Sequence, residues 1–205
     1  IEYKNQHVSG CASEDFLKKN EILIPVEKLY RQYTGESLAV KLTEFDEITG
    51  KIQYLVEQVE NITHIEGLGK YITAMLEIDA IFFNEDRHTN NIAVIYNEET
   101  HEYSLSPLFD QGLCLFADTR IDYPLELSYE ECLKKIEAKP FSTDFDIQLE
   151  AAEELYGTQL QFNFDIRDIN NMLDSVNDIY SEQICNRIKE LLRYQIRKYS
   201  YLMKR

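Results

Sequence analysis

Two polar motifs on either side of an apolar hairpin constrain the fold of this chain most strongly. The first motif is DRHTNN at residues 86–91, and the second is PLFD at residues 107–110. The sequence between them reads as strand, turn and strand (IAVIY, NEET and YSLSPL). An antiparallel hairpin returns its second strand to the place where the first began. We therefore expect Asn91 and Asp110 to lie close together, with Asp86 in the loop that leads into the hairpin.

The residue types in these motifs suit phosphoryl transfer, which needs mainly positioning and charge neutralisation around a metal-bound nucleotide. An acid such as Asp86 can orient an attacking hydroxyl. Asn91 and Asp110 offer the hard oxygen ligands that Mg²⁺ prefers. Asp86 and Asn91 are five residues apart, which is also the separation of the catalytic Asp and the metal-binding Asn in the protein-kinase catalytic loop. The residue types and their spacing therefore predict a site for phosphoryl transfer from a nucleotide bound to Mg²⁺.

Together, DRHTNN and LSPLFD resemble the catalytic loop and metal motif of the HipA-like serine/threonine kinases. The loop is also similar to that of the phosphatidylinositol-3/4-kinases, in which a His follows the catalytic Asp by two residues. The resemblance is specific over residues 68–116 and vaguer over residues 8–38. One departure is that Gln and Gly follow the last Asp of the second motif, so the Asp-Phe-Gly motif of protein kinases is only echoed.

The resemblance implies a role for each polar residue of the two motifs. Asp86 would be the catalytic base, and Asn91 and Asp110 would be the Mg²⁺ ligands that hold the cofactor. His88 would be the catalytic-loop histidine, either structural or facing a phosphate, and a simple hydrogen bond to the backbone is the alternative. Arg87 would contact a phosphate of the cofactor or pair with a surface acid, and exposure to solvent is the favoured reading of its position.

The rest of the chain is predicted to be mainly helical. Helices are expected over residues 26–33, 43–59, 68–83, 128–138, 144–156, 165–176 and 181–203. Apolar residues recur at helical spacing in the second, third and last of these segments, and Pro25 suits the start of the first. The expected N-caps of the last four helices are Ser128, Thr143, Asp165 and Ser181. The fold class expected is mainly α with a small β-hairpin, and the resemblance identifies it as a protein-kinase-like C-terminal lobe of the HipA-like type.

The loop over residues 112–124 follows the second motif, where kinases carry the activation segment that lies near the substrate. Its start (LCLFA) is apolar and its end (DTRIDY) is polar. An ordinary surface loop is the alternative, and the sequence leaves both readings open.

A complete kinase also needs a small β-rich lobe with a phosphate-covering loop and a phosphate-binding Lys. The chain has seven glycines and no G-x-G-x-x-G pattern. The glycines of Gly67-Leu68-Gly69-Lys70 open a predicted helix rather than join two strands. We therefore expect residues 1–205 to be a single C-terminal lobe, with the N-lobe upstream or on another chain. Such a lobe should fold alone and have little activity.

The charge of the chain limits its partners. There are 37 acidic and 21 basic residues, for a formal net charge of −16. A field of this sign repels nucleic acids and anionic membranes, so neither is an expected partner. It also repels ATP at long range, so a nucleotide would require Mg²⁺ and nearby positive groups.

The cysteines and the hydropathy of the chain indicate its surroundings. Cys11, Cys114, Cys132 and Cys185 show no metal-binding spacing, which is typical of reduced cysteines in a cytoplasmic protein. The sequence shows no signal peptide and no long apolar run. A cytoplasmic location is therefore expected.

Three functions are compatible with these residues. The favoured one is ATP- and Mg-dependent phosphoryl transfer to a Ser or Thr of a protein substrate. A partner that carries the N-lobe, or an antitoxin-like partner, is expected from the resemblance, since toxin–antitoxin roles are common in the family. The second is a lipid or small-molecule kinase, and the third is a non-catalytic interaction module that keeps the fold.

Overall fold

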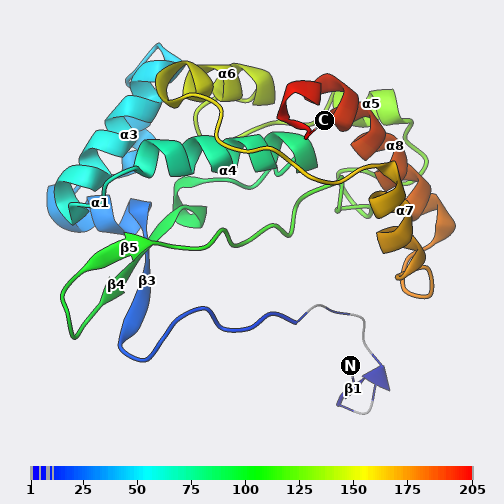
Figure 1. The fold of residues 1–205 in the computed structure, drawn as a ribbon, viewed down its shortest axis with the longest axis horizontal. Helices are drawn as coiled ribbons and strands as arrows, with labels where there is room; N and C mark the ends of the chain where they lie inside the picture. Colours follow the sequence, from blue (N-terminus) through cyan, green and yellow to red (C-terminus); the bar gives the residue numbers. More distant parts are fainter. Residues whose placement is uncertain (1, 5, 8–9, 11, 205) are drawn as a thin grey trace.

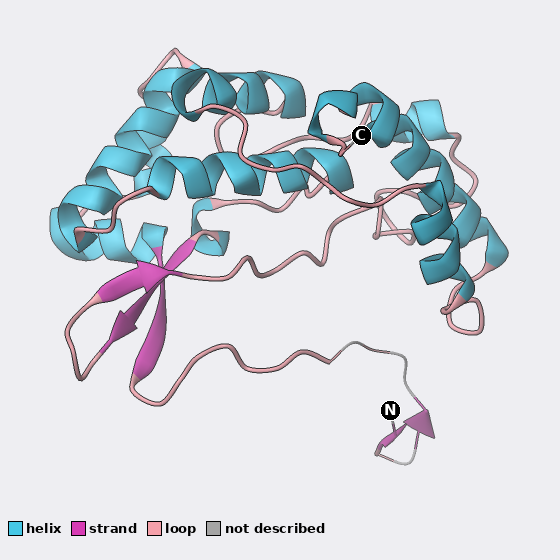
Figure 2. Cartoon of the chain, viewed as in Figure 1, coloured by secondary structure: helices cyan, strands magenta, loops and turns pink. Residues whose placement is uncertain are grey.

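The computed structural model describes residues 2–4, 6–7, 10 and 12–204. Val8 and Cys11, which belong to the vaguer part of the resemblance and to the cysteine set, lie outside the described residues. The fold is mainly helical with a small antiparallel sheet, as the sequence predicted (Figure 2). The helices are α1 (Val26–Thr34), α2 (Leu38–Leu42), α3 (Ile48–Thr63), α4 (Leu68–Phe82), η1 (Thr89–Asn91), α5 (Tyr129–Leu133), α6 (Phe145–Tyr156), α7 (Ile166–Asp174), α8 (Glu182–Lys198) and η2 (Ser200–Leu202).

The predicted hairpin is present and has a third strand beside it. Strands β4 (Ala93–Asn97) and β5 (Tyr103–Leu105) form the hairpin, and β3 (Glu21–Pro25) pairs antiparallel with β4. The sheet order β3-β4-β5 places β4 in the centre. A separate short pair joins β1 (Glu2–Tyr3) and β2 (Gln6–His7). The chain continues from β3 directly into α1. This helix therefore lies beside η1, at the end of the hairpin where β4 begins (Figure 1).

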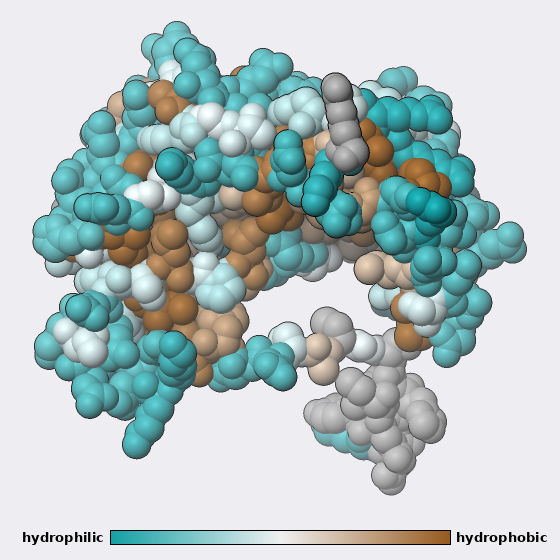
Figure 3. All heavy atoms as spheres, in the orientation of Figure 1, coloured by the Kyte–Doolittle hydropathy of each residue, from teal (hydrophilic) through white to brown (hydrophobic). Residues whose placement is uncertain are grey.

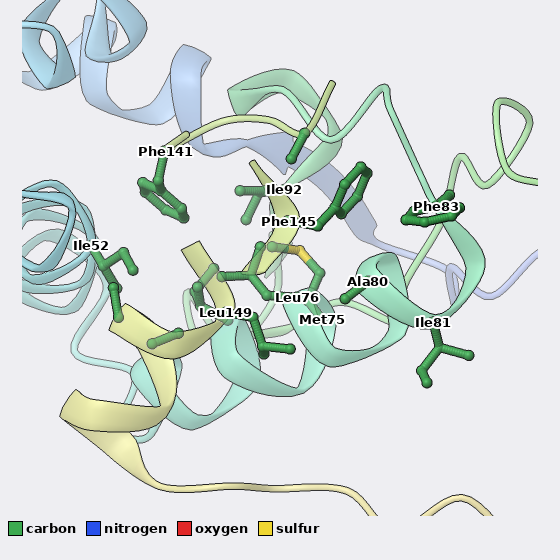
Figure 4. Close-up of a cluster of buried hydrophobic side chains, with 14 of the residues drawn as sticks. Ile52, Met75, Leu76, Ala80, Ile81, Phe83, Ile92, Phe141, Phe145 and Leu149 are labelled. Carbon is green, nitrogen blue, oxygen red and sulfur yellow. The ribbon is translucent and has the colours of Figure 1, made fainter. Parts of the chain in front are cut away.

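Helix α4 forms the centre of the helical body and packs against α3, α6 and α8 (Figure 1). Its apolar residues face those of α3 and α6, and Figure 4 shows Met75 and Leu76 turned toward Ile52 and Leu149. Helices α4 and α6 approach closely at Gly69, where an added Cβ would lie 2.3 Å from the ring of Tyr156. The helix that leads into the first motif is thus rigidly held along its length.

The surface is mostly hydrophilic, in contrast to the apolar interior. In the face shown in Figure 3, hydrophilic side chains cover the outer helices, and hydrophobic ones gather in the middle of the view near α4 and the sheet.

Cys132 and Cys185 are buried and Cys114 is partly buried, and all three are free thiols, as expected for reduced cysteines. Burial raises the pKa of the Cys114 thiol to about 12, so it is protonated and unreactive near neutral pH.

Several helix boundaries differ from those predicted. The helix expected over residues 43–59 begins only at Ile48, because the chain turns after the short α2 and packs Phe45 on the ring of Tyr54. The helix expected over 128–138 ends at Leu133, because the N–H of Ala138 donates to the carbonyl of Thr143 instead of continuing the helix.

The N-caps show a similar mixture of agreement and difference. Ser128, Asp165 and Ser181 are N-caps with side-chain hydrogen bonds, as predicted. The N-cap of α6 is Asp144 rather than Thr143, since its carboxylate accepts two N–H groups of the first turn. The last helix ends at Lys198 rather than at residue 203, and the 3-10 helix η2 follows it over Ser200–Leu202.

Candidate active site

Helix α4 delivers the chain to the first motif at a fixed point. Phe83 ends the helix in the left-handed region with φ 51°, and the N–H of Asn84 donates to the carbonyl of Asp79. The ring of Phe83 is buried against Phe116 and Phe145. A bulky residue in this backbone conformation is uncommon and is maintained by such packing. The start of the loop is therefore set by the core.

The loop is locked by a buried ion pair between Arg87 and Asp79. The Arg87 Nε lies 2.8 Å from Asp79 Oδ2 and Nη2 lies 3.0 Å from Oδ1, and both side chains have 0% exposure. The Asn84 amide donates to Asp79 Oδ1 at 2.9 Å. Burial raises the pKa of Asp79, while Arg87 and Asn84 favour its charged form. The expected exposure of Arg87 is wrong, because the guanidinium lies inside the protein on a buried carboxylate.

The same guanidinium joins the two motifs. Arg87 Nη1 donates to the carbonyl of Asn91 at 2.8 Å and to that of Phe109 at 3.1 Å. Asn91 and the residue before Asp110 therefore share one donor, which is the proximity that the hairpin predicted. With these bonds made, Arg87 is placed to position the loop rather than to contact a nucleotide.

The Asn91 side chain uses one of its two polar atoms in a hydrogen bond within the loop, and the other can bind a ligand. Its Nδ2 donates to the carbonyl of Asp86 at 2.9 Å, and in the described residues its Oδ1 accepts no hydrogen bond.

Thr89 of the same loop donates from its hydroxyl to the Glu27 carboxylate of α1 at 3.0 Å, which fixes the loop to the first helix. Burial opposes ionisation of Glu27, yet hydrogen bonds led by the N–H of Ala39 outweigh it and lower its pKa.

Asp110 is exposed and sits in a strained backbone conformation. Its φ is 56°, in the left-handed region that Asp tolerates better than most residues. Its carboxylate makes no hydrogen bond or ion pair with any side chain that the structure describes. Non-glycine residues held in this region cluster at functional sites.

Asp86 has one nitrogen-bearing side chain near each carboxylate oxygen. His88 Nε2 lies 3.7 Å from Oδ2, and Lys139 Nζ lies 3.3 Å from Oδ1. The Asp86 side chain is 31% exposed, so a substrate can reach it. His88 Nδ1 is buried and has no partner in the described part of the chain. Sequence reasoning missed Lys139, which lies 53 residues after Asp86 in a segment without a motif.

Glu85 ties the loop after the second motif to the first motif. Its Oε1 accepts from the Tyr123 hydroxyl at 2.5 Å and from the N–H of Glu137 at 3.3 Å. The N–H of Glu85 donates to Leu113, and Phe116 is buried. The loop over 112–124 is thus packed beside the first motif. A cavity of about 220 Å³ lies between them, lined in part by Glu85, Asp118, Asp122 and Lys139.

We expect Glu85→Gln to stabilise the protein in a pH-dependent way. Burial raises the pKa of Glu85 above its unfolded value, despite the donors Tyr123 and Glu137. Such a group favours the folded state when it is protonated. Its contribution to stability is therefore complete below the pKa that it has in the unfolded chain, and it is lost as the pH rises through the pKa that it has in the folded protein. The melting temperature of Glu85→Gln should therefore exceed that of the wild type at about pH 7, and the gap should close toward about pH 4. Glu98→Gln, an exposed acid, is the control, and an equal gap at every pH would contradict the assignment.

No cluster of three His, Cys, Asp or Glu side chains among the described residues is arranged to hold a metal ion. The candidate ligands are instead one carboxylate, Asp110, and one amide oxygen, that of Asn91. Mg²⁺ commonly takes only one or two protein carboxylates and completes its shell with phosphates and water. The available oxygens of Asn91 and Asp110 fit that requirement.

Comparison with known proteins shows the fold. No protein-family model matches the chain, and no curated protein matches it. Among solved structures, it is similar to the crystal structure of the Helicobacter pylori proinflammatory kinase CtkA, with a TM-score of 0.55 and 18% sequence identity over 90% of this chain and 70% of that one. The chain therefore has a kinase-like fold.

The helices of the described residues include none that combines the length and the apolar character of a membrane span.

Proposed function

We propose that this chain catalyses phosphoryl transfer from Mg-ATP to a Ser or Thr hydroxyl of a protein, as a kinase of the HipA-like type. The observation that carries the proposal is the Arg87 guanidinium, which holds the carbonyls of Asn91 and Phe109 together. This bridge gathers the polar groups of both motifs on a kinase-like fold. The motif spacing supports the same chemistry.

Each polar group has a role in this reaction. Asp86 accepts the proton of the attacking hydroxyl as a bond forms between that oxygen and the γ-phosphorus. The bond between the γ-phosphorus and the bridging oxygen of ADP breaks, and ADP leaves with that electron pair. Asn91 Oδ1 and the Asp110 carboxylate would hold Mg²⁺, which neutralises phosphate charge when bound. Arg87 keeps the two segments in register.

We further propose that residues 1–205 act as the C-terminal lobe of the kinase. The sequence contains no glycine-rich phosphate loop, so this function requires an N-lobe from the same polypeptide or from a partner chain. An antitoxin-like protein that controls the kinase is part of the same proposal. The acidic balance of the chain weighs against a lipid acceptor.

Transfer of the γ-phosphate from radiolabelled ATP to a panel of proteins tests the proposal. The full-length wild-type protein should label a protein on Ser or Thr only when Mg²⁺ or Mn²⁺ is present. Labelling of lipid or small-molecule acceptors alone would replace the proposed acceptor. Absence of labelling of every acceptor would contradict the function itself.

Asp110→Asn should weaken the metal site without removing the general base. Changes to groups that only support metal ligands cost about 10- to 100-fold in metal affinity or activity, so we expect at least a tenfold loss at low Mg²⁺. Raising Mg²⁺ or changing to Mn²⁺ should restore part of the rate. Asp46→Asn, an exposed acid remote from both motifs in the sequence, is the matched control. A defect that no concentration of metal relieves would argue that Asp110 is not a ligand.

A further inference from the structure

Lys139 presents an ammonium group at the proposed catalytic base. Its Nζ lies 3.3 Å from Asp86 Oδ1, and its side chain is 49% exposed. Ion pairs as exposed as this contribute little to stability. The stability of the fold therefore depends little on this pair, which lies at the carboxylate proposed to be the general base.

The backbone of Lys139 is fixed although its side chain is not buried. Gln148, which is 1% exposed, donates from Nε2 to the carbonyl of Lys139 at 3.1 Å and accepts from the N–H of Phe141 at 3.4 Å. Phe141 and Ala138 are buried on either side. A single buried amide thus anchors the segment from which Lys139 extends toward Asp86.

The charge distribution leaves a role for such a cation. The chain has a formal net charge of −16, and the Arg87 guanidinium is buried on Asp79. A transferred phosphoryl group carries negative charge on three equatorial oxygens, which must be neutralised as the reaction proceeds. Lys139 is the exposed cation of the described residues that lies in ion-pair contact with Asp86 beside His88.

The distances are compatible with contact between Lys139 and the transferred group. An acceptor hydroxyl must lie about 2.6–3.2 Å from its general base. Reacting atoms in a near-attack geometry are about 3–3.5 Å apart. A phosphoryl group placed in this way lies next to Asp86, within reach of a lysine whose Nζ is 3.3 Å from the same carboxylate.

We propose that Lys139 binds the transferred phosphoryl group during the reaction, an inference that rests on the proposed function. Its ammonium donates hydrogen bonds to the equatorial oxygens and exchanges no proton, since Asp86 takes the proton of the hydroxyl. Lysine suits this task as a compact point charge that binds phosphate. In the absence of nucleotide, its partner is Asp86.

Calorimetry with two probes on the full-length protein tests this role without measuring turnover. The probes are Mg-ADP and Mg-ADP with aluminium fluoride, which mimics the transferred group. Lys139→Ala should weaken binding of the fluoride complex on the order of 10²-fold, as for loss of one group that stabilises transition-state charge, and leave Mg-ADP binding within about twofold. Lys139→Arg should recover part of the loss.

Lys135→Ala is the matched control. Lys135 is an exposed lysine four residues earlier, and its ammonium donates to the carbonyl of Asp122 and lies over the Tyr123 ring. It should bind both probes like the wild type. If Lys139→Ala binds the fluoride complex normally, or loses both probes equally, the role of Lys139 is overturned while the proposed function stands. If the wild type binds neither probe, both fall.

Discussion

Asp86→Asn should lower the rate of phosphoryl transfer by about 10²- to 10⁴-fold, the usual cost of losing a general base. Asparagine keeps the size and most of the hydrogen-bonding capacity of Asp86 but does not take the proton of the acceptor hydroxyl. The Asp86 carboxylate is partly exposed and contacts only His88 and Lys139 in the described residues. Because none of these contacts is buried, the melting temperature should change little. The measurements are initial rates of γ-phosphate transfer and thermal melting.

Glu98→Gln, an exposed acid at the turn of the hairpin, should keep both rate and stability. Near-normal turnover of Asp86→Asn would show that another group accepts the proton. Unfolding of Asp86→Asn would show that the carboxylate is structural. Either result removes the main support for a kinase.

Arg87→Met should destabilise the protein by about 3–5 kcal/mol, the usual cost of removing one partner of a buried ion pair. The change leaves the Asp79 carboxylate buried with only the Asn84 amide, and it frees the carbonyls of Asn91 and Phe109. The free energy of unfolding in urea measures the loss. Arg31→Met is the matched control. Arg31 also forms an ion pair, with Glu27, but its side chain is 61% exposed. Its replacement should therefore lower the free energy of unfolding by less than about 1 kcal/mol.

The double variant Asp79→Leu/Arg87→Met separates stability from function. It leaves no uncompensated buried charge, so much of the stability should return. Phosphoryl transfer should stay low, because nothing then bridges the carbonyls of Asn91 and Phe109. A double variant that recovers activity together with stability would show that the bridge does not position the site.

Local patterns in the sequence predicted the parts of the site that are close in the chain. Helix α4, the loop after it and the hairpin follow one another without interruption, so periodicity and turn signals were sufficient to place Asn91 near the second motif. Strand β3 was missed because its partner β4 lies some seventy residues later, and a five-residue strand that runs into a helix has little pattern of its own.

Two features of the site depend on contacts that the sequence pattern does not contain. The burial of Arg87 had one signal, which is that Asp79 lies on the apolar face of α4 and a buried acid there requires a partner. Lys139 had none, because its approach to Asp86 depends on how the segment after α5 packs on Gln148. The net charge indicated that a local cation was needed without identifying it.

Paramagnetic broadening by Mn²⁺ in NMR spectra of the full-length protein tests the central claim most directly, because it locates the metal without reference to any acceptor. With a non-hydrolysable ATP analogue present, low Mn²⁺ should first broaden the side-chain amide of Asn91 and the backbone N–H of Asp110. The effect should be weak without nucleotide, since phosphates complete the metal shell, and it should diminish in Asp110→Asn. Broadening centred on the acidic surface near Glu153, or the same with and without nucleotide, would contradict a metal–nucleotide site built from these two motifs.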